Sequence, residues 1–150
     1  MRHRLLIVAV LAVALTSLAA CGSGPVPTPF TLSYPAATAG GDPVPISLVD
    51  QTGLVTSLTL APDASAGSDV EAAPGKSNTL LVSWQGGPCD DRETLVLNKI
   101  GGERYELAIH NHPPITAGLD CDAPTVARVI EISFKQQLAP EQLTLNITYP

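Results

Sequence analysis

Aromatic and basic residues are scarce in this chain of 150 residues. Aromatics make up 4% of the sequence, and eight Lys and Arg stand against fourteen Asp and Glu, which gives a net charge of −6. A polyanion is bound through clustered Lys and Arg, so this balance argues against a nucleic-acid partner. Charged residues are only 15% of the chain and hydrophobic residues 45%. That composition excludes a wholly disordered acidic protein and predicts one folded domain.

The motifs of common enzyme classes are missing as well. The sequence contains no Gly-x-Ser-x-Gly elbow, no His-Glu-x-x-His, no P-loop and no Gly-x-Gly-x-x-Gly. We therefore expect a protein that is not an enzyme and that uses no cofactor.

The first twenty residues have the organisation of a secretory signal peptide. A basic start, Met1–Arg4, precedes eleven consecutive apolar residues from Leu5 to Leu15. A membrane-spanning helix needs about twenty apolar residues, so this run is too short to span a bilayer but suits a signal peptide. Its removal takes away Arg2 and Arg4, which leaves six Lys and Arg against fourteen Asp and Glu and a net charge of −8.

The segment Leu18-Ala19-Ala20-Cys21 resembles the lipobox of bacterial lipoproteins. In that family a diacylglyceryl group is attached to the Cys thiol, and a dedicated signal peptidase cleaves just before the Cys. The resemblance implies that residues 1–20 are removed and that Cys21 is lipidated, which anchors the chain to the bacterial membrane outside the cytoplasm. Two or more acyl chains make such an anchor stable, because each buried methylene contributes about 0.8 kcal/mol. The alternative is an ordinary secretory signal that happens to precede a Cys.

Prolines are concentrated directly after this Cys. Six of the fourteen prolines lie between residues 25 and 45, and Pro at this density favours an extended polyproline II conformation. We expect residues 21–43 to form a lipidated tether and residues 44–150 to form the folded domain. The FTLSY segment at residues 30–34 fits either a first strand or the tether. Residues 62–76 are rich in Ala, Ser, Gly and Asp, and we expect a long loop there.

Hydrophobic and polar residues alternate repeatedly in the proposed domain. Near its end, for example, Leu143, Leu145 and Ile147 have one parity while Thr144 and Asn146 have the other. A period of two with one polar face predicts half-buried antiparallel strands. Seven strands are expected, at residues 46–49, 54–60, 79–84, 94–100, 104–110, 126–135 and 143–149. Their number and spacing predict an all-β, antiparallel immunoglobulin-like sandwich, with a closed barrel as the alternative.

Gly101-Gly102 separates two of these strands and is typical of a two-residue hairpin loop. With these glycines as the loop, Val96 pairs with Leu107. This register places Val96, Leu107 and Ile109 on one face.

Two cysteines, Cys89 and Cys121, remain once Cys21 is assigned to the lipid. Exported proteins most often pair such cysteines, and no Cys-x-x-Cys indicates redox chemistry. We therefore predict one structural disulfide between Cys89 and Cys121. Closing a loop of this length stabilises a fold by roughly 3–4 kcal/mol on the loop-entropy model.

Four carboxylates flank these two cysteines. They are Asp90, Asp91, Asp120 and Asp122. Carboxylates that converge from two segments can bind Ca²⁺, which takes six to eight oxygen ligands. The Asp-x-Asp-x-Asp-Gly spacing of known calcium loops is absent, however, and Asp also caps turns through its own side chain. The capping interpretation is the one we expect.

His110 and His112 form a His-x-His pair on a predicted strand, so both side chains point to one face together with Glu106. Such a pair can bind zinc or copper. Glu106 is too far along the strand to be a third ligand to His112, and we expect two histidines that face solvent. A metal-handling protein that uses Ca²⁺, Zn²⁺ or Cu²⁺ is the alternative function.

The stretch Trp84-Gln85-Gly86-Gly87-Pro88-Cys89-Asp90, followed by a second Cys and an alternating strand, is similar to small bacterial lipoproteins, often actinobacterial, with no assigned activity. The similarity covers residues 80–135 and implies a sandwich domain without implying any chemistry. We expect a membrane-anchored envelope lipoprotein that acts as a non-enzymatic binding or structural module. Its expected partners are the membrane and an envelope protein or cell-wall component. A small extracytoplasmic hydrolase is the remaining alternative.

Overall fold

The structure is a computed structural model that describes residues 26–35, 42–61, 69–86, 92–112 and 125–149. Within these ranges the chain forms nine strands and one short 3₁₀ helix, η1 (Pro140–Gln142). The strands are β1 (Thr28–Tyr34), β2 (Val44–Asp50), β3 (Val55–Leu60), β4 (Asp69–Ala72), β5 (Thr79–Gly86), β6 (Arg92–Gly101), β7 (Arg104–His112), β8 (Val126–Phe134) and β9 (Leu143–Thr148). The prediction of an all-β fold is confirmed for the described residues, but the prediction of seven strands is wrong in number.

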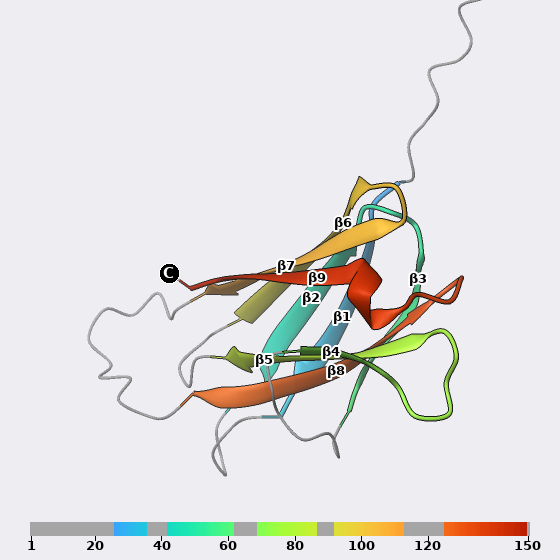
Figure 1. Ribbon diagram of the computed structural model, residues 1–150. Coiled ribbons are helices and arrows are strands. Elements are labelled where there is room, and N and C mark those ends of the chain that lie inside the picture. Colours follow the sequence, from blue (N-terminus) through green and yellow to red (C-terminus); the bar gives the residue numbers. More distant parts are fainter. Residues whose placement is uncertain (1–25, 36–41, 62–68, 87–91, 113–124, 150) are drawn as a thin grey trace, which may run out of the picture.

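The nine strands form two separate sheets that pack face to face as a sandwich, and not a closed barrel (Figure 1). One sheet has five strands in the order β1-β2-β6-β7-β9, and the other has four in the order β3-β8-β5-β4. Two pairs, β2 with β6 and β7 with β9, are parallel, so the expectation of a purely antiparallel fold is wrong. In both cases the chain passes through the opposite sheet before it returns, which lets it re-enter its own sheet in the same direction.

The two strands outside the seven expected ones, β1 and β4, both lie at sheet edges. The FTLSY segment, which fitted either a first strand or the tether, is part of strand β1. Strand β1 pairs with β2 from Thr28 opposite Asp50 to Tyr34 opposite Val44. Strand β1 therefore lies inside the range 21–43 that was expected to be tether. Pro29 is tolerated there because an edge strand has one side on which no backbone N–H is needed. Strand β4 lies within the loop expected at residues 62–76.

The β6–β7 hairpin forms where Gly101-Gly102 predicted one, but its two-residue loop is Gly102-Glu103, because Gly101 ends β6 and pairs with Arg104. The register also differs from the prediction by one residue. Leu97 pairs with Leu107, and a bulge between Lys99 and Gly101 leaves Ile100 without a ladder partner. A shift of one residue exchanges the two faces of a strand. Leu97 is therefore buried while Val96 is half-buried on the outer face, and the predicted pairing of Val96 with Leu107 is wrong.

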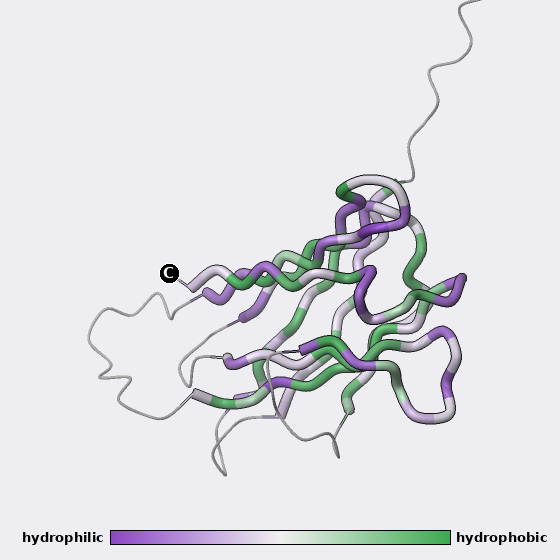
Figure 2. Tube along the Cα trace, in the orientation of Figure 1, coloured by the Kyte–Doolittle hydropathy of each residue, from purple (hydrophilic) through white to green (hydrophobic). Residues whose placement is uncertain are grey.

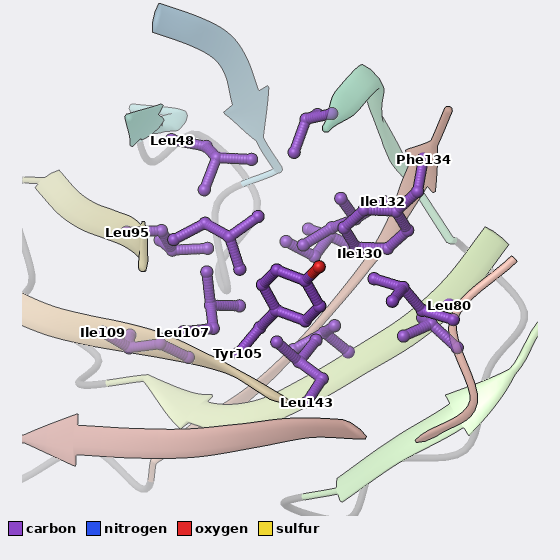
Figure 3. Close-up of a cluster of buried hydrophobic side chains, with 14 of the residues drawn as sticks. Leu48, Leu80, Leu95, Tyr105, Leu107, Ile109, Ile130, Ile132, Phe134 and Leu143 are labelled. Carbon is purple, nitrogen blue, oxygen red and sulfur yellow. The ribbon is translucent and has the colours of Figure 1, made fainter. Parts of the chain in front are cut away.

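The hydrophobic core lies between the two sheets. Figure 3 shows Leu48, Leu95, Leu107 and Ile109 of the five-stranded sheet opposite Leu80, Ile130, Ile132 and Phe134 of the four-stranded sheet, with the Tyr105 ring between them. Hydrophobic and hydrophilic residues alternate along the strands in Figure 2, which is the pattern that buries one face of each sheet. Fully burying each large aliphatic side chain contributes about 1.5–3 kcal/mol.

The strand pairings also define two ends of the sandwich. At the hairpin end lie Thr28, the Gly102-Glu103 loop, the turn at residues 73–78 and Lys135, which follows β8. At the far end lie Tyr34, Gly86, His112 and Val126. The chain leaves β1 toward its N-terminus at the hairpin end, and β9 finishes at the far end (Figure 1).

Candidate functional site

Most residues that the sequence singles out lie outside the described residues. They are Cys21, Cys89, Asp90, Asp91, Asp120, Cys121 and Asp122. The lipidated Cys, the disulfide and the acidic cation site therefore stay predictions. The nearest described strand residues do lie together, because Gly86, which precedes Cys89 in the chain, pairs with Val126, which follows Cys121.

His110 and His112 lie on the outer face of the five-stranded sheet, and both are half-buried, as is Glu106 on the same face. His112 Nε2 lies 3.2 Å from Thr94 Oγ1, and His110 stands opposite Thr94 on β6 and Thr148 on β9. The shared face of the pair is as predicted. Within the described ranges no three His, Cys, Asp or Glu side chains are placed to hold a metal ion together.

A buried ion pair, which was not predicted from the sequence, joins the two sheets near the far end. Glu93 on β6 and Arg128 on β8 are 0% and 1% exposed, and Arg128 Nε donates to Glu93 Oε1 at 3.0 Å. Trp84 on β5 donates its indole N–H to Glu93 Oε2 at 3.1 Å. A buried charge needs such partners, because desolvating an unpaired ion costs several kcal/mol.

Tyr34 on β1 covers the other side of the Arg128 guanidinium. The guanidinium carbon lies 4.9 Å from the centroid of the Tyr34 ring, within the range of a cation–π interaction. The Tyr34 hydroxyl accepts from the backbone N–H of Val129 at 3.0 Å and donates to the carbonyl of Ala127 at 3.4 Å. Tyr34 thus links an edge strand of one sheet to β8 of the other.

Gly86 at the end of β5 makes room for this ion pair. A Cβ atom at Gly86 would lie 2.7 Å from Glu93 Oε1 and 2.8 Å from Arg128 Nε. Both distances are shorter than van der Waals contact, so any side chain here displaces the two charged groups. The need for glycine at this position is therefore steric.

Asn111 on β7 completes the polar cluster, by which we mean Tyr34, Trp84, Glu93, Asn111 and Arg128. It stands opposite Glu93 in the ladder and is 6% exposed. Among the described side chains, Asn111 Nδ2, Asn111 Oδ1 and Arg128 Nη1 are the buried polar atoms that have no hydrogen-bond partner. Leaving such an atom unsatisfied costs about 1–3 kcal/mol. The stability of the fold alone therefore does not explain why these polar side chains are buried at the far end.

The sequence did contain a signal for the ion pair. Arg128 has the same parity as the apolar residues Ile130 and Ile132, and Glu93 has the parity of Leu95. Two opposite charges at core-facing positions of different strands predict a buried pair. The signal was missed at Glu93 because the strand was expected to begin at residue 94, whereas β6 begins at Arg92.

A groove of about 470 Å³ lies between the two edge strands β4 and β9. Apolar side chains and two carboxylates line it together. The lining residues are Asp69, Val70, Pro140, Glu141, Leu143 and Leu145. The groove is open on one side of the sandwich and is separate from the polar cluster.

Comparisons with protein-family models, with curated proteins and with solved structures found no match to this chain. No helix in the described part of the chain is long and apolar enough to cross a membrane. Glu93 and Arg128 are bonded to each other and shielded from solvent, so the chemistry that this geometry supports is the fixing of one sheet against the other.

Proposed function

We propose that this chain is a bacterial envelope lipoprotein, anchored through Cys21, whose β-sandwich is a non-enzymatic binding or structural module outside the cytoplasm. The observation that carries the proposal is the order of the segments. A basic start and an apolar run lead to Leu18-Ala19-Ala20-Cys21, and a β domain begins shortly afterwards at Thr28. This is the order of a lipoprotein precursor, in which the signal peptide is cleaved and the folded domain follows the lipid.

The start of β1 also limits how far the domain can stand from the membrane. Thr28 is the seventh residue after Cys21, and an extended chain spans at most about 3.6 Å per residue. The Cα atom of Thr28 therefore lies within about 25 Å of the Cα atom of Cys21, whatever path the chain takes. We therefore expect the hairpin end, where β1 begins, to lie closer to the bilayer than the far end.

The buried charges support a module without catalysis. Asp50, Glu93 and Arg128 are the buried charged side chains of the described residues, and each is hydrogen-bonded within the protein. A general acid or base must reach a proton of the substrate. These three groups have their oxygen and nitrogen atoms directed into the protein, which favours a structural role.

Two finer features belong to the same proposal. The two face-to-face sheets support an immunoglobulin-like sandwich, with the parallel pairs β2·β6 and β7·β9 as its departures from the usual arrangement. The pairing of Gly86 with Val126 supports a disulfide between Cys89 and Cys121, because it brings together the strand ends from which the two cysteine-containing segments continue.

The anchor is tested by the intact mass of the protein extracted from the membranes of an expressing bacterium. We expect a chain that begins at Cys21 and carries added acyl mass. Cys21→Ser should remain unprocessed or leave the membrane, whereas Cys89→Ser, the matched control, should keep the acyl mass. Recovery of a soluble mature form that lacks Cys21 would contradict the proposal.

A further inference from the structure

The hairpin end carries most of the exposed basic residues. Beyond the signal peptide the chain has six Lys and Arg: Lys76, Arg92, Lys99, Arg104, Arg128 and Lys135. Arg128 is buried and Arg92 begins β6 at the far end. The other four are exposed at the hairpin end, where Lys76 forms an ion pair with Glu131. A mature chain with a net charge of −8 therefore has its exposed positive charge concentrated at one end.

The tip of the β6–β7 hairpin places an apolar side chain among these charges. Every residue from Lys99 to Arg104 is exposed, and Ile100, at the bulge, is 50% exposed. Because the bulge removes Ile100 from the ladder, its side chain packs neither in the core nor against a cross-strand partner. Glu103 at the tip offsets one of the two positive charges. An exposed apolar residue flanked by long basic side chains is typical of a surface that meets a membrane interface.

The strand register places this tip at the same end of the sandwich as Thr28, where β1 begins. Thr28 is level with Asp50 on β2, and Asp50 is level with Leu97 on β6. From Leu97, β6 continues for three residues to Ile100, about 10 Å at ~3.3 Å per residue. Strand β6 therefore ends at the hairpin end, the end at which β1 begins (Figure 1).

We propose that the hairpin tip, residues Lys99 to Arg104, is a membrane-contacting surface of this protein. Ile100 enters the headgroup region of the bilayer, and Lys99 and Arg104 bind the phosphates of anionic phospholipids. The inference rests on the proposed anchor at Cys21. One apolar and two basic side chains bind a bilayer weakly on their own. A tether of at most about 25 Å gives the tip a high effective concentration at the bilayer, so a weak contact suffices to orient the domain.

An Ile100→Trp variant of the full chain, isolated in its acylated form, reports on the contact. It is reconstituted into vesicles of phosphatidylcholine and phosphatidylglycerol, with or without bromine on the acyl chains, because bromine quenches nearby Trp emission. The native Trp84 is fully buried near the far end and supplies a constant background. Tyr149→Trp is the matched control, because Tyr149 is also exposed, at 54%, but its hydroxyl donates to the Gln85 carbonyl at the far end.

We expect brominated lipid to quench the added emission of Ile100→Trp at least twofold and to leave that of Tyr149→Trp unchanged. Equal quenching of the two variants would overturn the proposal. An unchanged urea midpoint for Ile100→Trp confirms that the variant is folded, as expected for an exposed position.

Separate variants test the proposed binding of Lys99 and Arg104 to lipid phosphates. Lys99→Gln combined with Arg104→Gln, in the Ile100→Trp background, should reduce the quenching in phosphatidylglycerol vesicles, whereas Arg92→Gln should not. Undiminished quenching in the double variant would overturn the role of the two bases.

Vesicle flotation separates this inference from the anchor. If the native chain does not float with the vesicles, the lipid anchor fails and the hairpin contact fails with it. If the chain floats but Ile100→Trp is not quenched, only the hairpin contact is wrong.

Discussion

Glu93 and Arg128 form an ion pair that crosses the interior of the sandwich, from β6 in one sheet to β8 in the other. Most contacts between the sheets are apolar, and apolar contacts have little directionality. The paired charges are directional, and Trp84 holds the second carboxylate oxygen. The ion pair therefore defines how the two sheets are aligned at the far end, close to the strand ends that lead to Cys89 and Cys121.

Removing the cation from this pair should cost much of the stability of the domain. Arg128→Met removes the Arg128 guanidinium from the buried Glu93 carboxylate, and breaking such a pair typically costs about 3–5 kcal/mol. Adding Glu93→Gln removes the buried negative charge, so the double variant should be at least about 1 kcal/mol more stable than Arg128→Met alone. Urea unfolding of the full-chain variants measures both differences.

The control for this prediction is Arg92→Met, which removes an exposed Arg at the start of β6 and should change the free energy of unfolding by less than about 0.5 kcal/mol. If Arg128→Met costs no more than this control, the ion pair does not stabilise the fold.

Gly86→Ala should destabilise the same end of the sandwich. The added Cβ would meet Glu93 Oε1 at 2.7 Å and Arg128 Nε at 2.8 Å, and overpacking of this kind typically costs about 1–3 kcal/mol. Ser47→Thr adds one methyl group on the half-buried outer face of β2 and should be nearly neutral. The thermal midpoints of the two variants test this prediction. Equal midpoints would show that the ion pair shifts to accommodate the added Cβ without loss of stability.

The central strands were predictable from the sequence because each buries one face, so its apolar residues recur with a period of two. The edge strands β3 and β9 were also predicted, because their residues alternate in the same way. The edge strands β1 and β4 were not among the expected strands. Pro29 and the prolines around it indicated tether, and β4 is only four residues long, too short to show a clear period of two.

The register of the β6–β7 hairpin was predicted wrongly and the polar cluster was not predicted, and the reasons differ. The bulge at Ile100 is set by how the loop closes, and it shifts every later pair by one residue. The ion pair depends on two strands from different sheets, so Glu93 and Arg128 are neighbours only after the fold is known. The sequence indicated the pair only through one charged residue, on each of two strands, that shares the parity of the core-facing apolar residues.

Cys89→Ser should lower the thermal midpoint of the exported protein by ten degrees or more. Losing the predicted disulfide costs roughly 3–4 kcal/mol on the loop-entropy model, and each kcal/mol shifts the midpoint by about 4–8 °C for a domain of this size. Cys121→Ser should match it, because the two variants lose the same bond. Thiol labelling that finds both cysteines free in the folded protein would contradict the prediction.

Asp50 closes the connection between β2 and β3, and its loss should be severe. Its buried carboxylate accepts hydrogen bonds from the backbone N–H groups of Thr52, Gly53 and Val55 at 2.8, 3.1 and 2.8 Å, and from the Thr52 hydroxyl at 2.6 Å. Asp50→Ala leaves buried donors such as the Val55 N–H unpaired and should cost about 3 kcal/mol or more, since bonds to a charged group contribute about 1.5–3 kcal/mol each. Thr52→Val removes only the hydroxyl and should cost about 1–2 kcal/mol. Urea midpoints that rank Thr52→Val as the more damaging change would show that the carboxylate does not hold this turn.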